Sequence, residues 1–326
     1  MKYFFTPILY GCFVAALTAQ QAPQYSLFML NPYAYNPAYA GLQNTLVATG
    51  VYRQQWSGLK GAPLTQHVNA HLPLYVIHSG LGLKVENDAI GAHRVTQALA
   101  SYDYQLELGR NALLSVGGSA GYLQYTLDGD KLRAPQGTYA EPGGVFDHDD
   151  DLLPEGKIQA GTPIFELGLY LQARNLELGA AIQPVFVPVL KENGAGAFQL
   201  QPMRQYLFSA AYALSIGENA KLKPAVLVKT DAKETQMELS ALLRWRENIF
   251  VGGAFRGFTQ SSKDAAVLFA GLKINERTTL AYAFDIPLSP LNAANRGSHE
   301  LLLRYSLNQP IGAGKLPPVI YNPRFF

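Results

Sequence analysis

A regular alternation of apolar and polar residues dominates the chain from residue 45 onward and constrains the fold more than any other feature. In residues 279–286, large apolar side chains occupy every second position, with threonine, alanine or aspartate between them. Residues 97–108, 205–216 and 236–246 repeat the pattern, whereas helical periodicity is almost absent. Since successive side chains of a strand point to opposite faces, a period of two predicts β-strands and an all-β fold.

The alternating segments are longer than the strands of an ordinary soluble sheet. They run to about ten residues, which suits a tilted strand crossing a bilayer, while soluble strands average about five or six. Only 15% of the 326 residues are charged, against about 25% in a typical soluble domain. The polar faces nevertheless carry charges at Glu107, Glu166, Glu238, Arg244, Glu300 and Arg304. We therefore expect lipid on the apolar side and a polar lumen on the other; the alternative is an exported, soluble β protein of two layers.

The connections between strands are of two kinds. Short turns with Asn occur at Arg110-Asn111, Arg174-Asn175, Glu218-Asn219, Glu247-Asn248 and Asn275-Glu276-Arg277. We expect Asn there to adopt the left-handed backbone of tight hairpins. Longer links occupy residues 126–157, 185–203, 229–235, 257–265 and 287–297, and early hairpins lie near 56–64, 73–79 and 87–93.

Together these connections make six short turns and seven longer loops, and therefore 14 strands. An even number of strands with alternating short and long connections is typical of bacterial outer-membrane barrels. A sheet in hydrocarbon cannot leave an edge unpaired, so it must close. The prediction is a 14-stranded antiparallel transmembrane β-barrel over residues 45–307.

Residues 1–19 predict a secretory signal peptide. Lys2 precedes an apolar run from Ile8 to Leu17, and small residues lead to a cleavage position after Ala19. Beyond residue 20 there is no run of 18 apolar residues, so no helix of the mature chain is expected to cross a membrane. Export combined with a barrel predicts an integral protein of the bacterial outer membrane, in contact with its lipid.

Two segments do not alternate. Residues 20–44 are rich in Asn, Pro and Tyr, and residues 308–326 are rich in Pro and Gly. Disorder is the default for such segments at chain ends, but their aromatic residues favour packing. We expect the first segment to lie in the lumen as a plug and the carboxy-terminal tail to pack in or under it.

These two segments carry the first and the last of a series of different motifs that are spread over most of the chain. The amino-terminal motifs are Ala22-Pro23-Gln24-Tyr25-Ser26, Phe28-Met29-Leu30-Asn31-Pro32 and Asn36-Pro37-Ala38-Tyr39-Ala40-Gly41. Those that follow are Tyr52-Arg53-Gln54-Gln55-Trp56, Gly58, Gly61-Ala62-Pro63, Thr65-Gln66, Gly80-Leu81-Gly82, Asn87-Asp88 and Ile90-Gly91. The last are Gly297-Ser298-His299-Glu300 and Pro323-Arg324-Phe325-Phe326. With these motifs the chain resembles the PorP/SprF family, although residues 126–204 carry no matching motif.

The resemblance implies an outer-membrane barrel of the Bacteroidetes type IX secretion system. Some members work in the secretion machinery beside a peptidoglycan-binding protein, and others receive or anchor a secreted adhesin with a carboxy-terminal sorting domain, as in gliding motility. The motif positions that the resemblance marks as structurally important are Asn31, Pro32, Asn36, Pro37, Ala38, Tyr39, Gly41, Arg53, Trp56, Gly61, Pro63, Gly297, His299, Glu300, Pro323, Arg324 and Phe325.

Two apparent chemical motifs favour packing over catalysis or metal binding. Ser119 lies in a G-x-S-x-G pattern, which forms a nucleophile elbow only at a strand–turn–helix junction; here the alternation continues through it. His67 and His71 are four residues apart, which on a strand is about 13 Å, too far for one zinc ion. We interpret both histidines as polar residues of the lumen.

Residues 128–155 form an acidic stretch. Eight acidic and two basic residues give it a net charge of −6. It lacks the glycine and terminal glutamate of an EF-hand, so a solvated or partner-binding loop is preferred over a calcium site.

Composition excludes several classes of protein. A net charge of +2 argues against nucleic-acid binding. The single cysteine excludes a disulfide framework and a Cys-rich metal site. We expect neither a cofactor nor a resident metal.

The expected function is therefore non-enzymatic: binding a secreted protein or another secretion component, with the loops at 126–157 and 185–203 as the contact surface. The main alternative is an outer-membrane channel for small, hydrophobic solutes, which a lateral opening and an apolar lumen pocket would favour. A membrane hydrolase built on Ser119 is a third hypothesis, which needs a serine, a histidine and an acid on one face.

Overall fold

The computed structural model describes residues 23–139, 146–150, 153–187, 190–191, 199–200, 202–257, 264–289 and 295–308. The expected signal peptide and most of the carboxy-terminal tail, including Pro323, Arg324 and Phe325, lie outside the described residues. Within them, every helix is too short or too polar to cross a bilayer.

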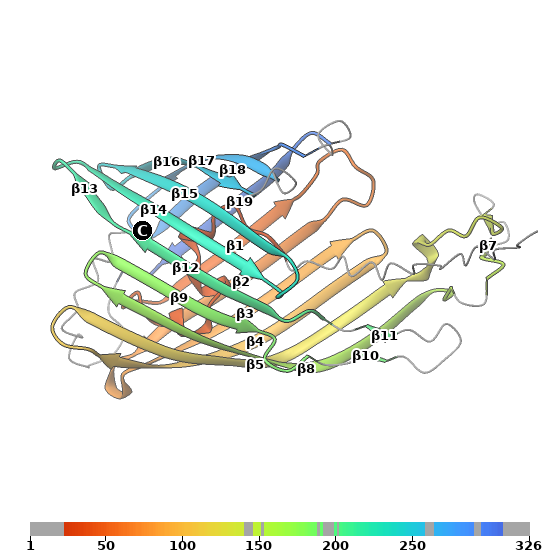
Figure 1. The fold of residues 1–326 in the computed structure, drawn as a ribbon, viewed down its shortest axis with the longest axis horizontal. Coiled ribbons are helices and arrows are strands. Elements are labelled where there is room, and N and C mark those ends of the chain that lie inside the picture. The colour runs from red at the N-terminus through yellow and green to blue at the C-terminus, as the bar shows by residue number, and fades with distance from the viewer. Residues whose placement is uncertain are drawn as a thin grey trace, which may run out of the picture.

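The described strands form one closed antiparallel barrel (Figure 1). Its 14 strands are β1 (Val47–Gln54), β2 (Leu64–Leu74), β3 (Ser79–Ile90), β4 (His93–Glu107), β5 (Ala112–Asp128), β8 (Lys157–Ala173), β9 (Leu176–Gln183), β12 (Gln205–Tyr212), β14 (Ala220–Thr230), β15 (Thr235–Trp245), β16 (Ile249–Arg256), β17 (Ala265–Lys273), β18 (Thr278–Pro287) and β19 (Ser298–Ser306). The short β13 (Leu214–Ile216) continues β12 beyond Ala213 and also pairs with β14.

Pairing runs around the whole barrel. The first and last strands meet with Val47 opposite Ser306, and β12 pairs with β9 on one side and β14 on the other. Each barrel strand in the described residues therefore has two neighbours, as a sheet surrounded by lipid requires. The prediction of a 14-stranded barrel is confirmed, and no α-helix occurs in the described part of the chain.

The two faces of the strands are those that the alternation predicted. In β18, Tyr282 is 44% exposed on the outer face, whereas its neighbour Ala281 is 2% exposed on the inner face. Residues of β4 and β15 follow the same rule, and Glu166, Glu238 and Glu300 all lie on the inner face. The apolar outer face is thus the one that faces lipid, and the polar face surrounds the lumen.

The connections divide the barrel into two ends. The short-turn end holds residues 75–78, 108–111, 174–175, 217–219, 246–248 and 274–277. The long-loop end holds residues 55–63, 91–92, 129–156, 184–204, 231–234, 257–264 and 288–297. Within these connections lie η4 (Tyr75–Ile77), η5 (Gly129–Lys131) and two small hairpins, β6 (Thr138–Tyr139) with β7 (Phe146–Asp147) and β10 (Leu190–Lys191) with β11 (Gln199–Leu200).

The expected role of Asn in the short turns is wrong. None of the five predicted turn asparagines has a positive φ angle; Arg174, Arg246, Glu247, Gly109 and Gly217 adopt that conformation. At one turn, Asn275 Oδ1 accepts from the backbone N–H groups of Arg277 and Thr278 at 2.9 and 2.8 Å, so this side chain stabilises its turn by hydrogen bonding. The turns lie where the sequence predicted them.

The barrel wall is tallest over β4, β5 and β8, which have 15, 17 and 17 residues, whereas β1 has 8 (Figure 1). On the outer face, Thr96 Oγ1 donates to Asn87 at 3.0 Å and Gln124 donates to Gln159 at 2.8 Å. With Gln66 these form a polar row across β2, β3, β4, β5 and β8. We infer that the apolar belt ends at this row and that the taller wall continues beyond it.

Residues 23–44 lie inside the barrel (Figure 1). They form three single-turn 3₁₀-helices, η1 (Phe28–Leu30), η2 (Pro32–Ala34) and η3 (Pro37–Tyr39). Pro32 and Pro37 each begin a turn, where the missing N–H costs nothing. The Asn36 side chain caps η3 by accepting from Ala38 N at 3.0 Å. The sequence prediction that this segment packs in the lumen is confirmed for these residues.

Candidate functional site

The amino-terminal segment runs through the lumen from the long-loop end toward the short-turn end. Ser26, near its start, contacts Arg53 close to the end of β1 that leads into residues 55–63. Gly41, near its other end, donates its N–H to His71 Nδ1 at 3.1 Å, close to the end of β2 that leads into residues 75–78. The even strand number leaves Val47 and Ser306 at the short-turn end, so the start of the described chain lies opposite them.

Ser26 is the centre of a buried group of charges at the long-loop end. Its backbone N–H donates to Glu300 Oε2 at 2.7 Å, and its hydroxyl donates to Asp285 Oδ1 at 2.6 Å. Arg53, 1% exposed, bridges Asp285 at 2.7 Å and Glu300 at 3.1 Å. One serine of the plug is therefore bound to three strands of the wall.

A second arginine completes this group. Arg256 donates to Glu238 at 2.8 Å and Asp285 at 3.0 Å, and both arginines donate to Ser26 Oγ at 2.9 Å. We call Ser26, Arg53, Glu238, Arg256, Asp285 and Glu300 the Ser26 charge cluster. Such charges are tolerated inside a protein only when they are paired and hydrogen-bonded. The cluster thus fixes the start of the segment to β1, β15, β16, β18 and β19.

Close backbone contacts hold the middle of the segment. Gly117 of β5 lies under Ala38, and a Cβ atom at Gly117 would be 2.6 Å from Ala38 Cα. Gly82 of β3 leaves room for the ring of Tyr33, whose hydroxyl lies 2.7 Å from Ser101 Oγ. On β8, the strand next to β5, Asn36 Nδ2 donates to the carbonyl of Leu169 at 2.8 Å. The segment therefore packs closely against this part of the wall because small residues face it.

The segment leaves the lumen through polar contacts at the short-turn end. Arg304 of β19 donates to the Leu30 carbonyl at 3.1 Å and also to the side chain of Gln43. Gln43 in turn donates to the Tyr39 hydroxyl at 2.9 Å. In η4, the hydroxyl of Tyr75 donates to the Asn44 carbonyl at 2.5 Å, and burial raises the pKa of this tyrosine to about 12.

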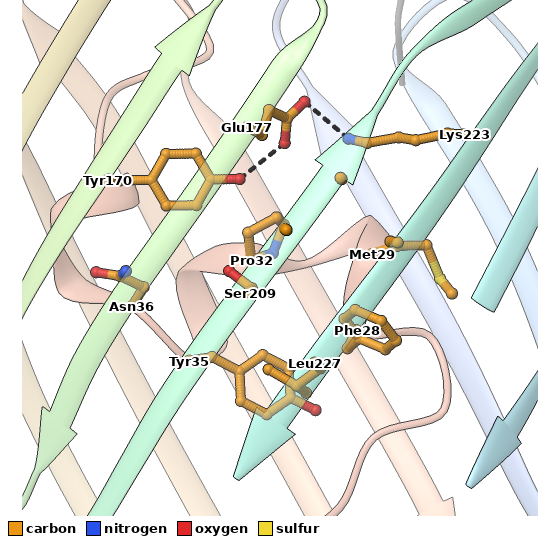
Figure 2. A pocket seen from close by; sticks show the side chains of 13 residues that line it. Phe28, Met29, Pro32, Tyr35, Asn36, Tyr170, Glu177, Ser209, Lys223 and Leu227 are labelled. Carbon is orange, nitrogen blue, oxygen red and sulfur yellow. Dashed lines mark hydrogen bonds and ion pairs between the residues drawn. The ribbon is translucent and has the colours of Figure 1, made fainter. Parts of the chain in front are cut away.

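An apolar cavity remains between the segment and the β8, β9, β12 and β14 wall (Figure 2). Phe28, Met29 and Leu227 line one part of it, and Glu177 accepts from Tyr170 and Lys223 at 2.7 and 2.8 Å in another. The centre of a water molecule can reach about 40 Å³ of it. The cavity therefore has room for several water molecules.

A polar cavity lies at the long-loop end of the segment, and we call it the long-loop cavity. Lys84, Lys229, Gln97, Gln183 and Gln205 line it together with residues of the segment. About 50 Å³ is open to water centres. Gln183 ends β9, Gln205 begins β12 and Lys229 is the penultimate residue of β14, so the cavity borders the loops.

The marked residues that the structure describes fall into three places, with the exception of His299. Asn31, Pro32, Asn36, Pro37, Ala38, Tyr39 and Gly41 lie in the segment. Arg53 and Glu300 meet in the Ser26 charge cluster. Trp56, Gly61, Pro63 and Gly297 lie at the long-loop end, where Ser57 N donates to the Gly297 carbonyl at 2.7 Å and Gly91 N to the Gly61 carbonyl at 2.9 Å.

His299 is separate from the others. It lies on the outer face of β19, and its Nδ1 is 2.6 Å from the hydroxyl of Tyr282. The structure thus brings two of the sequence-marked residues into direct contact across the closing strands and leaves this one facing outward. The importance of each marked position stays a prediction.

The other sequence motifs occupy polar positions of the lumen. Ser119 lies within β5, and its Oγ is 2.7 Å from Ser101 Oγ, so the strand is continuous where an elbow would need a helix. His67 contacts Glu86 and Asn69, whereas His71 contacts Gly41.

The described part of the acidic loop is held by local contacts. Asp128 pairs with Lys131 at 3.3 Å, and Asp130 accepts from Gly156 N at 3.0 Å. Glu141 and Asp151 lie outside the described residues. Within the described ranges there is no group of three or more His, Cys, Asp or Glu side chains that could hold a metal ion.

Sequence reasoning placed Glu238 and Glu300 on the lumen face and marked Arg53, but it did not predict that these residues meet at Ser26. Ser26 belongs to a motif without periodicity, so its hub position has no local signal. Asp285 and Arg256 are also detectable, because each is a charged residue on the inner face of a strand. A buried charge at such a position is stable only when it is paired, which predicts an opposite charge nearby in the lumen.

Solved structures that resemble this chain are outer-membrane barrels. The toluene transporter TbuX of Ralstonia pickettii has 11% identity and a TM-score of 0.50, over 84% of this chain and 92% of that chain. A FadL homologue of Pseudomonas aeruginosa has 10% identity and a TM-score of 0.42, over 84% and 92%. Omp33 of Acinetobacter baumannii has 9% identity and a TM-score of 0.41, over 80% and 97%. The likeness to TbuX shows a shared fold.

Sequence comparison identifies the family. No curated protein sequence matches the chain, but a family model described as type IX secretion system membrane protein PorP/SprF matches residues 17–305. That range includes the luminal segment, the Ser26 charge cluster and the barrel strands almost to the end of β19. The protein is an outer-membrane β-barrel, and the chain belongs to the PorP/SprF family of type IX secretion system membrane proteins.

Proposed function

We propose that this protein is a non-enzymatic, plugged barrel that binds a secreted protein or another subunit of the type IX secretion system. The observation that carries the proposal is the seating of residues 23–44 inside the lumen, attached at both ends of the barrel. A barrel filled by its own chain is suited to serve as a rigid mount. Family membership supports secretion components as the class of partner.

The contact surface that we propose is the long-loop end. Residues 129–156 and 184–204 are the longest connections, and the taller wall of β4, β5 and β8 supports the first of them. Loops on a rigid scaffold commonly carry binding function. A cell-surface adhesin with a sorting domain fits this end, because the long loops of outer-membrane barrels face outward, whereas a peptidoglycan-binding subunit would contact the periplasmic short turns. The experiment must choose between these two partner types.

Affinity purification of the tagged protein from outer membranes, with identification of what co-purifies, tests the proposal. One large secreted protein would indicate anchoring, and a peptidoglycan-binding subunit would indicate the secretion machinery. A variant in which a Gly-Ser linker replaces residues 185–203 should lose an adhesin but keep the barrel. Shortening residues 231–234, at the same end, is the control. Recovery of the barrel alone, under conditions that preserve other outer-membrane complexes, would contradict the proposal.

A transport channel is the second candidate. The fold likeness to TbuX and the apolar cavity beside β12 favour it, whereas the continuous pairing of β12 with β9 and β14 leaves no lateral opening in that part of the wall. Conductance in planar bilayers distinguishes the two functions. Large, steady openings of the intact protein would support the channel, and a closed lumen would support the mount.

A further inference from the structure

The two cavities follow one another along the same side of the lumen, between residues 23–44 and strands β9, β12 and β14. The long-loop cavity meets these strands at Gln183, Gln205, Leu207 and Lys229. The apolar cavity meets them nearer the short-turn end, at Glu177, Ser209, Ala211, Lys223, Ala225 and Leu227 (Figure 2). Each cavity has room for several water molecules. Together they form an interrupted passage over nearly the whole length of β9.

The interruption lies at Tyr35. Within the part of the chain that the structure describes, Tyr35 is the residue that lines both cavities. Its side chain is buried in one apolar cluster with Leu207 and Leu227, and Lys229 Nζ of β14 lies 4.8 Å from the centre of its ring. An apolar constriction stops water and ions because they lose their hydration there. The Tyr35 ring therefore separates two wet spaces.

The ring and the backbone of Tyr35 are held by different residues. Gln183 of β9 donates to the Tyr35 carbonyl at 2.7 Å, and the Tyr35 N–H donates to the Pro32 carbonyl at 3.1 Å. The hydroxyl accepts instead from the backbone N–H of Tyr25 at 3.2 Å, and the two rings meet edge to face with their centres 5.7 Å apart. Tyr25 in turn donates its hydroxyl to Glu86 of β3. The position of the ring thus depends on the first residues of the segment, while its backbone stays attached to β9.

Polar groups line the passage on both sides of Tyr35. Toward the short-turn end, Glu177 accepts from the Tyr170 hydroxyl at 2.7 Å and from Lys223 at 2.8 Å (Figure 2). The Glu177 side chain is 19% exposed, so water reaches this group. Toward the long-loop end, the glutamines and lysines of the long-loop cavity provide further donors and acceptors. Since both sides suit water and ions, the apolar constriction is the barrier between them.

We propose that the two cavities form a passage for water and small ions along β9, β12 and β14, and that the Tyr35 ring is its gate. The gate is closed in this structure, and it opens when the ring leaves the contact with Tyr25 and turns away from the wall. This activity goes beyond the proposed function, for which a seated segment is sufficient. It also differs from the second candidate function, because the permeating species are water and ions rather than apolar solutes.

Conductance of the full-length protein in planar bilayers with potassium chloride tests the gate. The wild type and Tyr35→Phe, which keeps the ring, should show no steady openings, whereas Tyr35→Ala should show them. Tyr33→Ala is the matched control and should stay closed. Tyr33 belongs to the same segment, but its hydroxyl meets Ser101 of β4, and it lines neither cavity. Residues 23–44 of Tyr35→Ala should keep the protease resistance of the wild type, because the segment stays seated.

A thiol placed in the passage locates the current. The single cysteine of the chain is Cys12, within the expected signal peptide. Adding Ser209→Cys to Tyr35→Ala therefore gives the processed protein one thiol, beside the apolar cavity. A positively charged thiol reagent should reduce the current through this variant. The same reagent should leave the current unchanged when Ser119→Cys is combined with Tyr35→Ala, since Ser119 lies on β5 beside Ser101.

A Tyr35→Ala protein that stays closed would overturn the proposal, and so would equal openings of Tyr33→Ala. Current that the reagent does not reduce at Ser209→Cys would place the ion path elsewhere and also overturn it. Loss of protease resistance in Tyr35→Ala would assign the current to an unseated segment, against the gate. Failure of the proposed function is distinct: large, steady openings of the wild type contradict the closed mount, whereas a closed Tyr35→Ala protein contradicts only the gate.

Discussion

At the scale of single residues, buried charges from distant parts of the sequence form ion pairs with one another in the lumen. Ser26 lies within hydrogen-bond distance of two arginines and two acids from the second half and the first strand of the barrel. No single pair explains the arrangement, because Arg53 and Asp285 each have more than one partner. Removing any one member of such a network is destabilising, because it leaves other charges buried and unpaired.

Arg53→Met tests this interdependence. The substitution leaves Glu300 without its cation in a dry environment, and we expect it to destabilise the barrel by about 3–5 kcal/mol. Urea unfolding in detergent, followed by the mobility shift of the folded barrel on gels, measures the loss. Adding Glu300→Gln to Arg53→Met should restore part of the stability, because the unpaired charge is gone. A double variant less stable than Arg53→Met would contradict a net ionic interaction between these residues.

The sequence predicted one part of this cluster and not the rest. Glu238 and Glu300 can be identified as lumen residues from the sequence, because each acid lies on the polar face of an alternating strand. The partners of those acids cannot be identified, because the sequence contains no information about which strands face each other across a lumen until the barrel closes. Ser26 has the weakest signal, since η1 to η3 have no periodicity from which an orientation could be derived.

At the scale of elements, strands and turns are the predictable part of this protein. Two-residue alternation gives each strand and its faces, and register follows once one face must meet lipid. The length of individual loops is less predictable: residues 91–92 belong to the long-loop end but form a two-residue turn. The luminal segment is an element of another kind, because its shape is determined by the walls that enclose it.

Gly117→Val tests how the segment is held. The new side chain would overlap Ala38, and we expect an overpacking cost of about 1–3 kcal/mol. Residues 23–44 should then leave their seat, become sensitive to added protease and open the barrel to ions. Gly50→Val is the control, because a Cβ atom at Gly50 of β1 has no neighbour within 4 Å. If conductance and protease resistance match the wild type, close packing at Gly117 does not retain the segment.

At the scale of the whole molecule, the barrel presents apolar side chains to lipid and encloses an interior in which buried charges lie beside an apolar core. The outer face is apolar up to the row of Gln66, Asn87, Thr96, Gln124 and Gln159. Beyond that row, the partly exposed apolar residues of β4, β5 and β8 face inward.

Leu268→Lys tests this boundary. Leu268 is 61% exposed near the middle of β17, and a lysine on the lipid face at the bilayer centre costs about 2–4 kcal/mol. Gln124→Lys, in the polar row, should cost about 0–1 kcal/mol because water is within reach. Unfolding of both variants in lipid vesicles measures the difference. Equal costs would mean that the polar row lies inside the hydrocarbon.

The route of the luminal segment has a consequence for biogenesis. The first described residues emerge from export well before β16, β18 and β19, yet Arg256, Asp285 and Glu300 on those strands are their binding partners. The segment lacks its binding partners until the final strands are in place. The buried charges of those strands, in turn, are hydrogen-bonded to Ser26 of the segment. Closure of the barrel and packing of the luminal segment are therefore one cooperative event, because the amino-terminal segment can bind only after the last strands have been added.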